Sequence, residues 1–361
     1  MNMTSAPLRV GITGANARRG WATDAHLGAL RALPQFAIQA VSARTMEIAE
    51  EARALYGAVS AYDDSLALAR DPDVDIVAVT VKVPEHRAIV MAGIAAGKHI
   101  YCEWPLGRDL AEARDIAQAA RAAGVHVAIG LQGANSLAVH HAAKLVSDGA
   151  IGRPLTLRVV SPTAGWGAES PAHYAYLQDK RNGATLSTIA GGHTLATIEA
   201  VVGDYADVTA LASIVQGEMK LSGTDECIAR TCADHLLVSG RHVGGCVSSL
   251  EVVGGVTEVP FEFIVRGTAG TLTISGGHPG GYQAGRLAVT TTPGSVAQPS
   301  ATAPELNGPP ANVSEMWTRF AGDIRSGTHT VPDFDRAARL TLLLDTIDQS
   351  SDDGRRLRVE Y

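Results

Sequence analysis

Short apolar runs alternate with helix-like segments through the first 130 residues of this 361-residue chain, and this alternation restricts its fold more than any other feature. Strands are predicted at residues 8–14, 36–43, 75–81, 99–105 and 125–133. The segments between them have the apolar spacing of helices, at residues 22–33, 46–56, 85–97 and 110–124. Strands that alternate with helices of this length predict βαβ units and a parallel sheet.

The pattern changes in the second part of the chain, where strands follow one another without long helices between most of them. Strands are predicted at residues 155–163, 207–215, 233–240, 243–253, 261–267 and 270–276. Turn residues join these runs, which predicts a large, open, mostly antiparallel sheet. Helices are predicted at residues 137–147, 185–202, 313–325 and 334–350, and the Pro/Ser/Thr/Ala-rich stretch 290–312 is predicted to be an exposed loop.

These patterns predict two domains, an α/β dinucleotide-binding domain over residues 1–133 and an α+β domain over residues 134–361. The second is expected to bind substrate and form oligomer contacts, and its C-terminal helices to pack back toward the first domain.

Composition excludes several classes of partner. Thirty Lys and Arg residues against 37 Asp and Glu give a net charge of −7, and no basic run predicts direct nucleic-acid contact. No apolar run of about 18 residues predicts a membrane span, and no signal peptide is evident. The four cysteines lack C-x-x-C spacing, which is typical of reduced thiols in a cytoplasmic protein. No metal site is expected, because His140 and His141 are adjacent on a predicted helix and point apart.

The segment VGITGANARRGWA follows the first strand and resembles an altered phosphate-binding turn. Gly14 fits the first glycine of G-x-G-x-x-G, but Asn16 stands at the position of the second glycine. Gly20 lies one residue beyond the position of the third glycine. Asparagine tolerates left-handed backbone better than most residues, and its amide can donate to a phosphate oxygen. The extra residue predicts a wider turn, with Arg18 and Arg19 near the bound anion.

The end of the second strand indicates which dinucleotide binds. An acidic residue there would bond the ribose 2′-hydroxyl of NAD(H), but this chain has Ser42 and Arg44. A hydroxyl and a guanidinium suit a 2′-phosphate, so NADP(H) is favoured and NAD(H) stays possible. The alternative is that Arg44 is an ordinary solvated side chain.

The segment AGKHIYCEWPL resembles the glucose–fructose oxidoreductase/inositol dehydrogenase (Gfo/Idh/MocA) family, and so do TVKVPEHRAIVMAGIAAGKH, GTAGTLTISG and the C-terminal helices. The resemblance implies a Rossmann domain followed by an α+β domain with an open, mainly antiparallel sheet. It also implies that the substrate lies between the nicotinamide and that sheet, whose outer face forms homodimers or homotetramers.

One branch of the family, that of the galactose-regulon repressor of yeasts, is more similar still. The shared segments are GANARRGWA, LQGANS, GWGAE, PAHYAYLQDKRNG, GGHTL and DHLLVSG, with the Glu-Trp pair at residues 103–104. The likeness implies that NADP or NAD binds through the N-A-x-x-G-W-A turn, which adds Ala17 to the cofactor residues. The yeast protein is a sensor that masks an activator, whereas bacterial relatives are presumed oxidoreductases.

Family dehydrogenases commonly use the Lys of an E-K-P motif and an Asp-x-x-x-His pair. Here Trp104 replaces the Lys and Ile189 replaces the Asp, while His193 is present. Loss of one such electrostatic or acid–base group commonly costs about 10²–10⁴ in rate. The sequence therefore argues against the standard mechanism for a sugar alcohol.

Two functional hypotheses follow. In the first, the protein transfers a hydride to or from a small carbonyl, enone, imine or sugar-like substrate. The predicted catalytic residues are then His193, Tyr176 and Lys180, and the predicted substrate pocket contains Trp104, Trp166, Tyr174 and His193. In the second hypothesis, the protein binds a dinucleotide as a sensor and catalyses nothing. NAD-assisted glycoside cleavage is a further possibility, but it needs the same depleted hydride-transfer apparatus.

Other residues are expected around the nicotinamide. They are Val81, Lys82, His86, Glu103, Trp104 and Gln132. Glu103 is expected to brace the turn around the nicotinamide ribose. His86 begins a predicted helix, so a capping or packing role is the alternative for it.

Overall fold

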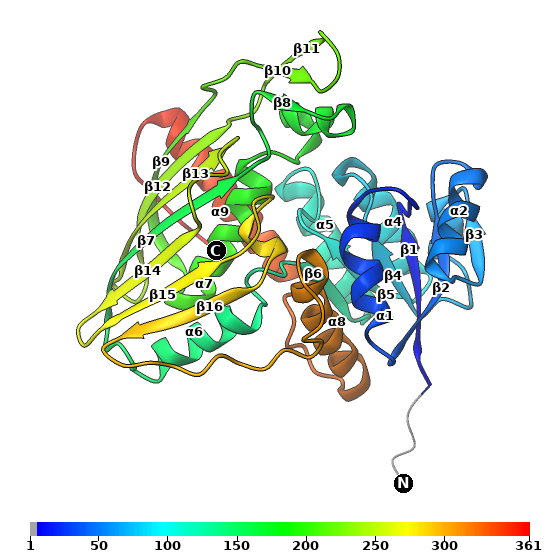
Figure 1. Cartoon of the computed structure of the whole chain (residues 1–361), viewed down its shortest axis with the longest axis horizontal. Coiled ribbons are helices and arrows are strands. Elements are labelled where there is room, and N and C mark those ends of the chain that lie inside the picture. Colours follow the sequence, from blue (N-terminus) through cyan, green and yellow to red (C-terminus); the bar gives the residue numbers. More distant parts are fainter. Residues whose placement is uncertain (1–5) are drawn as a thin grey trace. The chain divides into compact units, whose positions relative to one another are not determined.

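The computed structural model describes residues 6–361, which form two compact units (Figure 1). One unit contains the chain up to Leu131 together with Ala301–Ala338, and the other contains Gln132–Ser300 and Arg339–Tyr361. This differs from the predicted division, which placed every residue after 133 in the second domain. Within the described residues, no helix has the length and apolarity needed to cross a membrane.

The first unit is built on a six-stranded sheet with the order β3-β2-β1-β4-β5-β6, in which every neighbouring pair is parallel. The strands are β1 (Leu8–Thr13), β2 (Phe36–Ser42), β3 (Ser60–Tyr62), β4 (Ile76–Val79), β5 (His99–Glu103) and β6 (Val127–Gly130). This order is that of a Rossmann fold, which confirms the prediction for this half of the chain. The sequence did not reveal β3, because three residues are too few to show a pattern.

Helices connect these strands. They are the π-helix η1 (Ala22–Leu27), α1 (Gly28–Arg31), α2 (Met46–Tyr56), α3 (Ser65–Ala69), α4 (Val83–Ala95) and α5 (Leu110–Ala123). Three of these helices are capped at their N-termini, α2 by Thr45, α3 by Asp64 and α5 by Asp109. Each of these side chains accepts a hydrogen bond from a backbone N–H of the first turn. Such caps satisfy donors that the helix itself leaves unpaired.

A helix from the C-terminal part of the chain completes the core of the first unit. This helix, α8 (Pro309–Ser326), packs against η1 and α1. Its fully buried Trp317 and Phe320 join a core that includes Ile12 and Tyr101. The predicted loop 290–312 is correspondingly shorter, because its first residues belong to a strand and α8 begins at Pro309.

The second unit contains an eight-stranded sheet with the order β16-β15-β14-β7-β13-β12-β9-β17. Its strands are β7 (Pro154–Thr163), β9 (Tyr205–Ser213), β12 (His235–His242), β13 (Val247–Gly254), β14 (Glu262–Gly267), β15 (Thr271–Gly276), β16 (Leu287–Thr292) and β17 (Leu357–Arg358). Only the β7–β13 pair is parallel among the neighbours of this sheet. The predicted open, mostly antiparallel sheet is therefore confirmed.

Further elements of this unit are short or helical. A small sheet joins β8 (Glu169–Ser170), β10 (Glu218–Leu221) and β11 (Cys227–Ala229). The helical segments are α6 (Leu137–Ser147), η2 (Ala172–Gln178), η3 (Lys180–Asn182), the π-helix η4 (Ser187–Gly191), α7 (Gly192–Val202) and η5 (Tyr282–Ala284). The last long helix of the chain is α9 (Phe334–Asp353).

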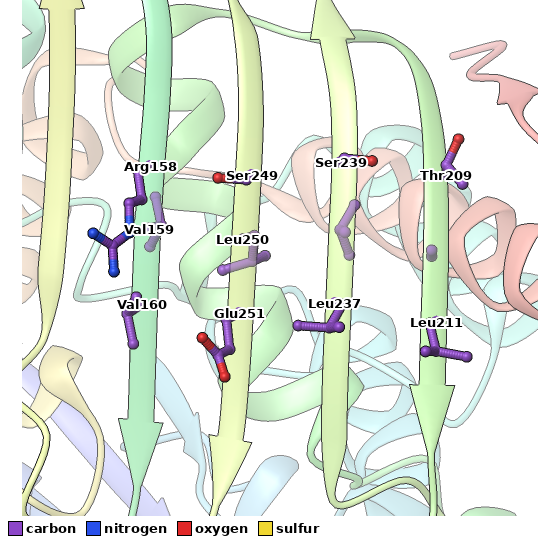
Figure 2. A pocket seen from close by; sticks show the side chains of 12 residues that line it. Arg158, Val159, Val160, Thr209, Leu211, Leu237, Ser239, Ser249, Leu250 and Glu251 are labelled. Atoms are coloured by element: carbon purple, nitrogen blue, oxygen red, sulfur yellow. The ribbon is translucent and has the colours of Figure 1, made fainter.

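The two faces of the large sheet differ. Along β13, Leu250 and Val252 are buried, whereas Ser249 and Glu251 are exposed, as expected where one face is covered by helices. The covered face packs against α6 and η4. Figure 2 shows the opposite face, where side chains of β7, β13, β12 and β9 line a shallow concavity.

Candidate dinucleotide and substrate sites

The turn after β1 is shaped by a glycine that no other residue can replace without strain. Gly14 has a φ of +72°, and a Cβ added there would lie 3.0 Å from Val81 Cγ1 and 3.2 Å from the Thr80 carbonyl oxygen. A side chain would therefore meet both an unfavourable backbone conformation and crowding. The glycine lets the turn after β1 approach the turn after β4 at the carboxyl edge of the sheet, where such sheets bind ligands.

Asn16, which stands at the position of the second glycine, stabilises the turn through hydrogen bonds within it. Asn16 Oδ1 accepts a hydrogen bond from the backbone N–H of Arg18 at 2.9 Å. The hydroxyl of Thr23 donates to the Asn16 carbonyl and lies 2.7 Å from the hydroxyl of Tyr56. Because the Asn16 oxygen is engaged, its amide N–H groups are the part that can donate to a phosphate.

The two arginines of the turn lie at its surface. Arg18 is 79% exposed, with Nη2 3.3 Å from a carboxylate oxygen of Glu51 on α2, and Arg19 is exposed as well. Ala17 lies between Asn16 and these arginines and is half-buried. An exposed ion pair contributes little to stability, so an incoming phosphate can compete for Arg18.

The extra residue of the turn is followed by an unusual helix. The first part of this helix, η1, is π-helical, and a π turn holds about one residue more than an α turn. The backbone N–H groups of Thr23 and Asp24 both donate to the Gly20 carbonyl at 2.9 Å. Backbone N–H groups at a helix N-terminus attract anions, so the glycine cradle and this helix start fit a dinucleotide diphosphate.

The two residues predicted to bind a 2′-phosphate lie in different environments. Ser42 is fully buried, and its hydroxyl is 2.9 Å from that of Ser65, so Ser42 does not fit the predicted role. Arg44 is exposed, directly before the Thr45 cap of α2. Only the guanidinium of this predicted pair is therefore placed to meet a ligand.

His86 connects two loops of the same sheet edge. Its Nε2 lies 3.0 Å from the Val81 carbonyl and its Nδ1 lies 2.9 Å from the Pro105 carbonyl. The ring is 1% exposed, and burial lowers the pKa of His86. His86 thus holds the turn after β4 beside the turn after β5 instead of contacting a ligand directly. Lys82, at the N-cap of α4, is exposed.

Glu103 and Trp104 lie at the end of β5. Glu103 Oε1 lies 2.8 Å from Nε2 of the buried His26, and its side chain is 12% exposed. Trp104 is 5% exposed, so an apolar ring occupies the position where the resemblance implied a lysine. The sequence analysis missed His26, which only the fold brings to Glu103.

In the second unit, His193 is buried without an orienting partner. It lies in the first turn of α7, is 4% exposed, and its Nδ1 has no hydrogen-bond partner among the described residues. Burial lowers the pKa of His193 to about 3, so the ring is neutral at physiological pH. A neutral imidazole can donate or accept a hydrogen bond, but it is not the imidazolium that a general acid requires.

The Tyr/Lys cluster lies on η2 and η3. Tyr174 is 43% exposed, Tyr176 is half-buried and Lys180 is exposed. Burial raises the pKa of Tyr176 to about 12, so its phenol keeps its proton at neutral pH. The structure brings these three residues into one segment of the second unit, and Tyr176 is the less exposed of the two phenols.

Trp166 fixes this segment. Its indole N–H donates to the Leu177 carbonyl of η2 at 3.2 Å, and the residue is 5% exposed. Its φ of +59° is unusual for a bulky residue. A Cβ on Gly254 would lie 2.9 Å from the Trp166 Cβ, so the backbone of β13 approaches this ring closely.

Gln132 is a second buried group without a partner. It is 1% exposed, and its Oε1 accepts no hydrogen bond from the described residues. The neighbouring Gly133 approaches the Tyr282 hydroxyl, which donates to the His193 carbonyl at 2.7 Å. Gly133 thus lies near the hydrogen bond that joins Tyr282 to the first turn of α7.

A buried ion pair, which the sequence analysis did not identify, holds the small sheet and η2. Arg230 Nη1 donates to Asp234 at 2.7 Å, Nε donates to Gln178 Oε1 at 2.7 Å, and Nη2 donates to the Gly167 carbonyl at 2.7 Å. Both charged side chains are fully buried. Three of these residues fall in the segments GWGAE, LQDKRNG and DHLLVSG, so part of the branch resemblance reflects this internal network.

Comparison with known proteins assigns both halves of the chain. Residues 8–131 match the oxidoreductase family with an NAD-binding Rossmann fold, GFO_IDH_MocA. Residues 138–276 match the C-terminal domain of Gal80p.

Similar proteins include both dehydrogenases and regulators. Dehydrogenase aclE of Aspergillus oryzae is 34% identical over 227 residues, which are 61% of this chain and 62% of that protein. The galactose/lactose metabolism regulatory protein GAL80 of Saccharomyces cerevisiae is 28% identical over 293 residues, 75% of this chain and 67% of that protein. The matched region thus spans about two thirds or less of these relatives.

Solved structures agree with this assignment. A super-repressor mutant of Gal80p from Saccharomyces cerevisiae superimposes with a TM-score of 0.87 at 25% identity over 98% of both chains. Levoglucosan dehydrogenase in complex with NADH and levoglucosan shares the fold, with a TM-score of 0.83 at 22% identity over 98% of this chain and 99% of that one. The chain therefore combines an N-terminal Rossmann domain that matches the Gfo/Idh/MocA oxidoreductase family with a C-terminal domain of the Gal80p type.

Proposed function

We propose that the protein is an NADP(H)-dependent oxidoreductase that transfers a hydride to or from a small carbonyl, enone, imine or sugar-like substrate. The observation that carries the proposal is the turn after β1, which stays ordered despite its departures from G-x-G-x-x-G. Gly14 fits against Val81, and Asn16 closes the turn internally. When bound at this turn, a nicotinamide dinucleotide would supply or accept the hydride. The 34% identity to a dehydrogenase supports this proposal.

The preference for NADP(H) rests on the exposed Arg44. No acidic residue occurs at positions 42–45, where a carboxylate would favour the ribose of NAD(H). A guanidinium binds a phosphate through two parallel hydrogen bonds, which gives both strength and orientation. NAD(H) is the alternative cofactor.

The substrate-side residues favour a substrate that needs little acid catalysis. His193 is neutral and has no carboxylate at position 189 to orient it. It can offer a hydrogen bond to a substrate oxygen or nitrogen, and the protonated phenol of Tyr176 can do the same. Activated carbonyls, enones and imines suit such neutral donors better than an alcohol that must lose a proton.

A second candidate function, a non-catalytic dinucleotide sensor, is favoured by two observations. The C-terminal domain matches that of Gal80p, and Nδ1 of His193 has no hydrogen-bond partner among the described residues. In this alternative, bound dinucleotide controls association with a partner instead of reacting.

The decisive assay follows nicotinamide absorbance with purified protein and a panel of ketoses, aldehydes, enones and cyclic imines. We expect NADPH consumption with one class. His193→Ala is expected to lower turnover at least tenfold, roughly the smallest effect of losing a catalytic group, with unchanged NADPH affinity. Tight NADPH binding without consumption would favour the sensor, and equal turnover in the variant would remove His193 from the mechanism.

We also propose a homodimer or homotetramer formed through the outer face of the large sheet. Leu211 and Leu237 are 55% and 47% exposed on this face, beside Arg158 and Glu251 (Figure 2). Leu237→Lys is expected to reduce the mass measured by sedimentation velocity. An unchanged mass would place the interface elsewhere.

A cytoplasmic location is part of the same proposal. The four cysteines are free thiols, as a reducing compartment would keep them, and Cys102, Cys232 and Cys246 are buried. Small-molecule substrate and cofactor are the partners that we propose, without direct contact to nucleic acid or membrane.

A further inference from the structure

We infer that His26 and Trp317 form a hydrogen-bonded relay that positions Glu103 for dinucleotide binding, so both are positioning residues of the cofactor site. The inference rests on the proposed function, because Glu103 is expected from the sequence to brace the turn around the nicotinamide ribose of a bound dinucleotide. It adds two residues, from η1 and α8, that no sequence motif connects to the site.

The relay is continuous and buried. The indole N–H of Trp317 donates to Nδ1 of His26 at 3.1 Å, and Nε2 of His26 lies 2.8 Å from Glu103 Oε1. His26 and Trp317 are both fully buried. The His26 ring also packs edge-on against Tyr101, with ring centroids 5.1 Å apart. These contacts leave the imidazole one orientation.

The hydrogen bonds also fix where the proton of the ring resides. Trp317 can only donate, so Nδ1 of His26 must accept and carries no proton. The ring proton therefore lies on Nε2 and points at Glu103. The groups that face the imidazole are the Glu103 carboxylate, the Tyr101 phenol ring and the Trp317 indole.

The Glu103 carboxylate lies against Gly130, where there is no room for a side chain. A Cβ on Gly130, at the end of β6, would lie 2.7 Å from Glu103 Oε2. Oε1 is bound by His26, which leaves Oε2 to accept from a ligand hydroxyl. Glu103 thus lies at the carboxyl edge of the sheet, between a glycine on one side and the imidazole on the other.

The relay links the phosphate turn to the ribose carboxylate. His26 belongs to η1, the π-helix that directly follows the turn. Single π turns often occur at functional sites, because the extra residue changes which side chains face inward. The helix that starts at the phosphate turn therefore also orients the carboxylate at the end of β5.

The first test compares two substitutions at one position by titration with NADPH. His26→Leu removes the N–H that faces Glu103, whereas His26→Gln places an amide N–H near the same point. We expect Leu to weaken NADPH binding at least about tenfold, the effect of losing one hydrogen bond to a charged group, and Gln to stay within about threefold of the wild type. Phe320→Leu, which changes packing beside Trp317 without removing either hydrogen bond, is the control for core damage.

The outcomes separate this inference from the proposed function. Wild-type protein that fails to bind NADPH or NADH removes the proposed function, and the relay with it. If the wild type binds NADPH and the affinity of His26→Leu is within about twofold of it, the relay alone is overturned. The relay is also overturned if His26→Gln binds NADPH as weakly as His26→Leu, because packing would then explain the result. Thermal unfolding of each variant identifies a protein that does not fold.

The second test uses Trp317→Phe, which keeps an aromatic ring beside Tyr101 and removes the N–H. Nδ1 of His26 then has no donor, so the ring proton is no longer fixed on Nε2, where it faces Glu103. We expect NADPH affinity to fall by at least about threefold in this variant. An affinity equal to that of the wild type, in a variant with unchanged thermal unfolding, would overturn the role of Trp317.

Discussion

The turn after β1 and the first turn of α7 both present polar groups, but the two regions differ in how these groups are bonded. In the first unit, Asn16, His86 and Glu103 each have a hydrogen-bond partner that fixes their orientation. In the second unit, Nδ1 of His193 and Oε1 of Gln132 are buried without a partner in the described chain. A buried polar atom without a partner costs about 1–3 kcal/mol, so such atoms call for an explanation.

The difference indicates which region already has its binding geometry before a ligand binds. In the dinucleotide region, Asn16, His86 and Glu103 are already held in place, although Trp21 Nε1 and the Tyr101 hydroxyl are also buried without a partner among the described residues. The substrate-side region leaves donors and acceptors unsatisfied, which a substrate or an ordered water can satisfy. Four substitutions test this comparison.

The largest effect is expected at the buried ion pair of the second unit. Asp234→Ala leaves the Arg230 guanidinium buried without its counter-charge, which costs about 3–5 kcal/mol. Urea unfolding measures this loss. The control is Asp225→Ala, which breaks the exposed pair with Lys220 and is expected to leave stability unchanged. Equal stability of all three proteins would show that the network does not hold this region.

Acid stability should depend on His193. Its pKa is about 3 in the folded chain against an ordinary value of 6.5, so the unfolded chain binds one more proton between these values. The free energy of unfolding should therefore fall by about 1.4 kcal/mol per pH unit below about pH 6.5, through this residue alone. His193→Gln should remove that slope in urea titrations at several pH values. Parallel slopes in the two proteins would contradict a buried, neutral His193.

Gly14→Ala should strongly weaken dinucleotide binding while costing modest stability. The backbone strain at φ +72° costs about 1 kcal/mol, and the added Cβ disturbs the contact with Val81. We expect NADPH affinity to fall about a hundredfold, or about 2.7 kcal/mol. Gly124→Ala has a similar φ of +64° and open space around it, so it should show the stability cost without the affinity loss. Equal affinity losses would mean that unfolding, not the cradle, controls binding.

Arg44→Ala gives the smallest effect and concerns the choice of cofactor. Loss of a charge-assisted contact to the 2′-phosphate should weaken NADPH about tenfold and leave NADH unchanged. Arg19→Ala, also an exposed arginine but next to the diphosphate turn, should weaken both cofactors alike. If Arg44→Ala lowers both affinities together, the assignment of the 2′-phosphate to Arg44 is wrong.

Much of the fold follows from local sequence patterns. The helices at residues 46–56 and 137–147 begin and end where the apolar spacing and caps predict. The strands β3, β8, β11 and β17 were missed because two or three residues show no periodicity, and the four-residue β10 was missed as well. The six-residue β16 was missed because its last three residues belong to the Pro/Ser/Thr/Ala-rich stretch that was predicted to be a loop. Alternation along the chain therefore predicts the sheets, but not all of their members.

The candidate sites were predicted less completely, because their hydrogen bonds join distant segments. Glu103 was expected at the cofactor, but His26 lies 77 residues before Glu103 in the chain, and Trp317 lies 291 residues after His26. Ser42 was expected to face the ligand, but strand β2 turns it toward Ser65. Residue type and spacing indicate what a side chain can do, whereas the fold decides which way it points.

The most direct test of the account is a calorimetric titration of the wild-type protein with NADPH and with NADH, beside Gly14→Ala. We predict binding of both cofactors by the wild type, with NADPH tighter by about tenfold, and affinities about a hundredfold lower for both in the variant. Failure of the folded wild type to bind either dinucleotide would contradict the central claim that the altered turn is a working phosphate site.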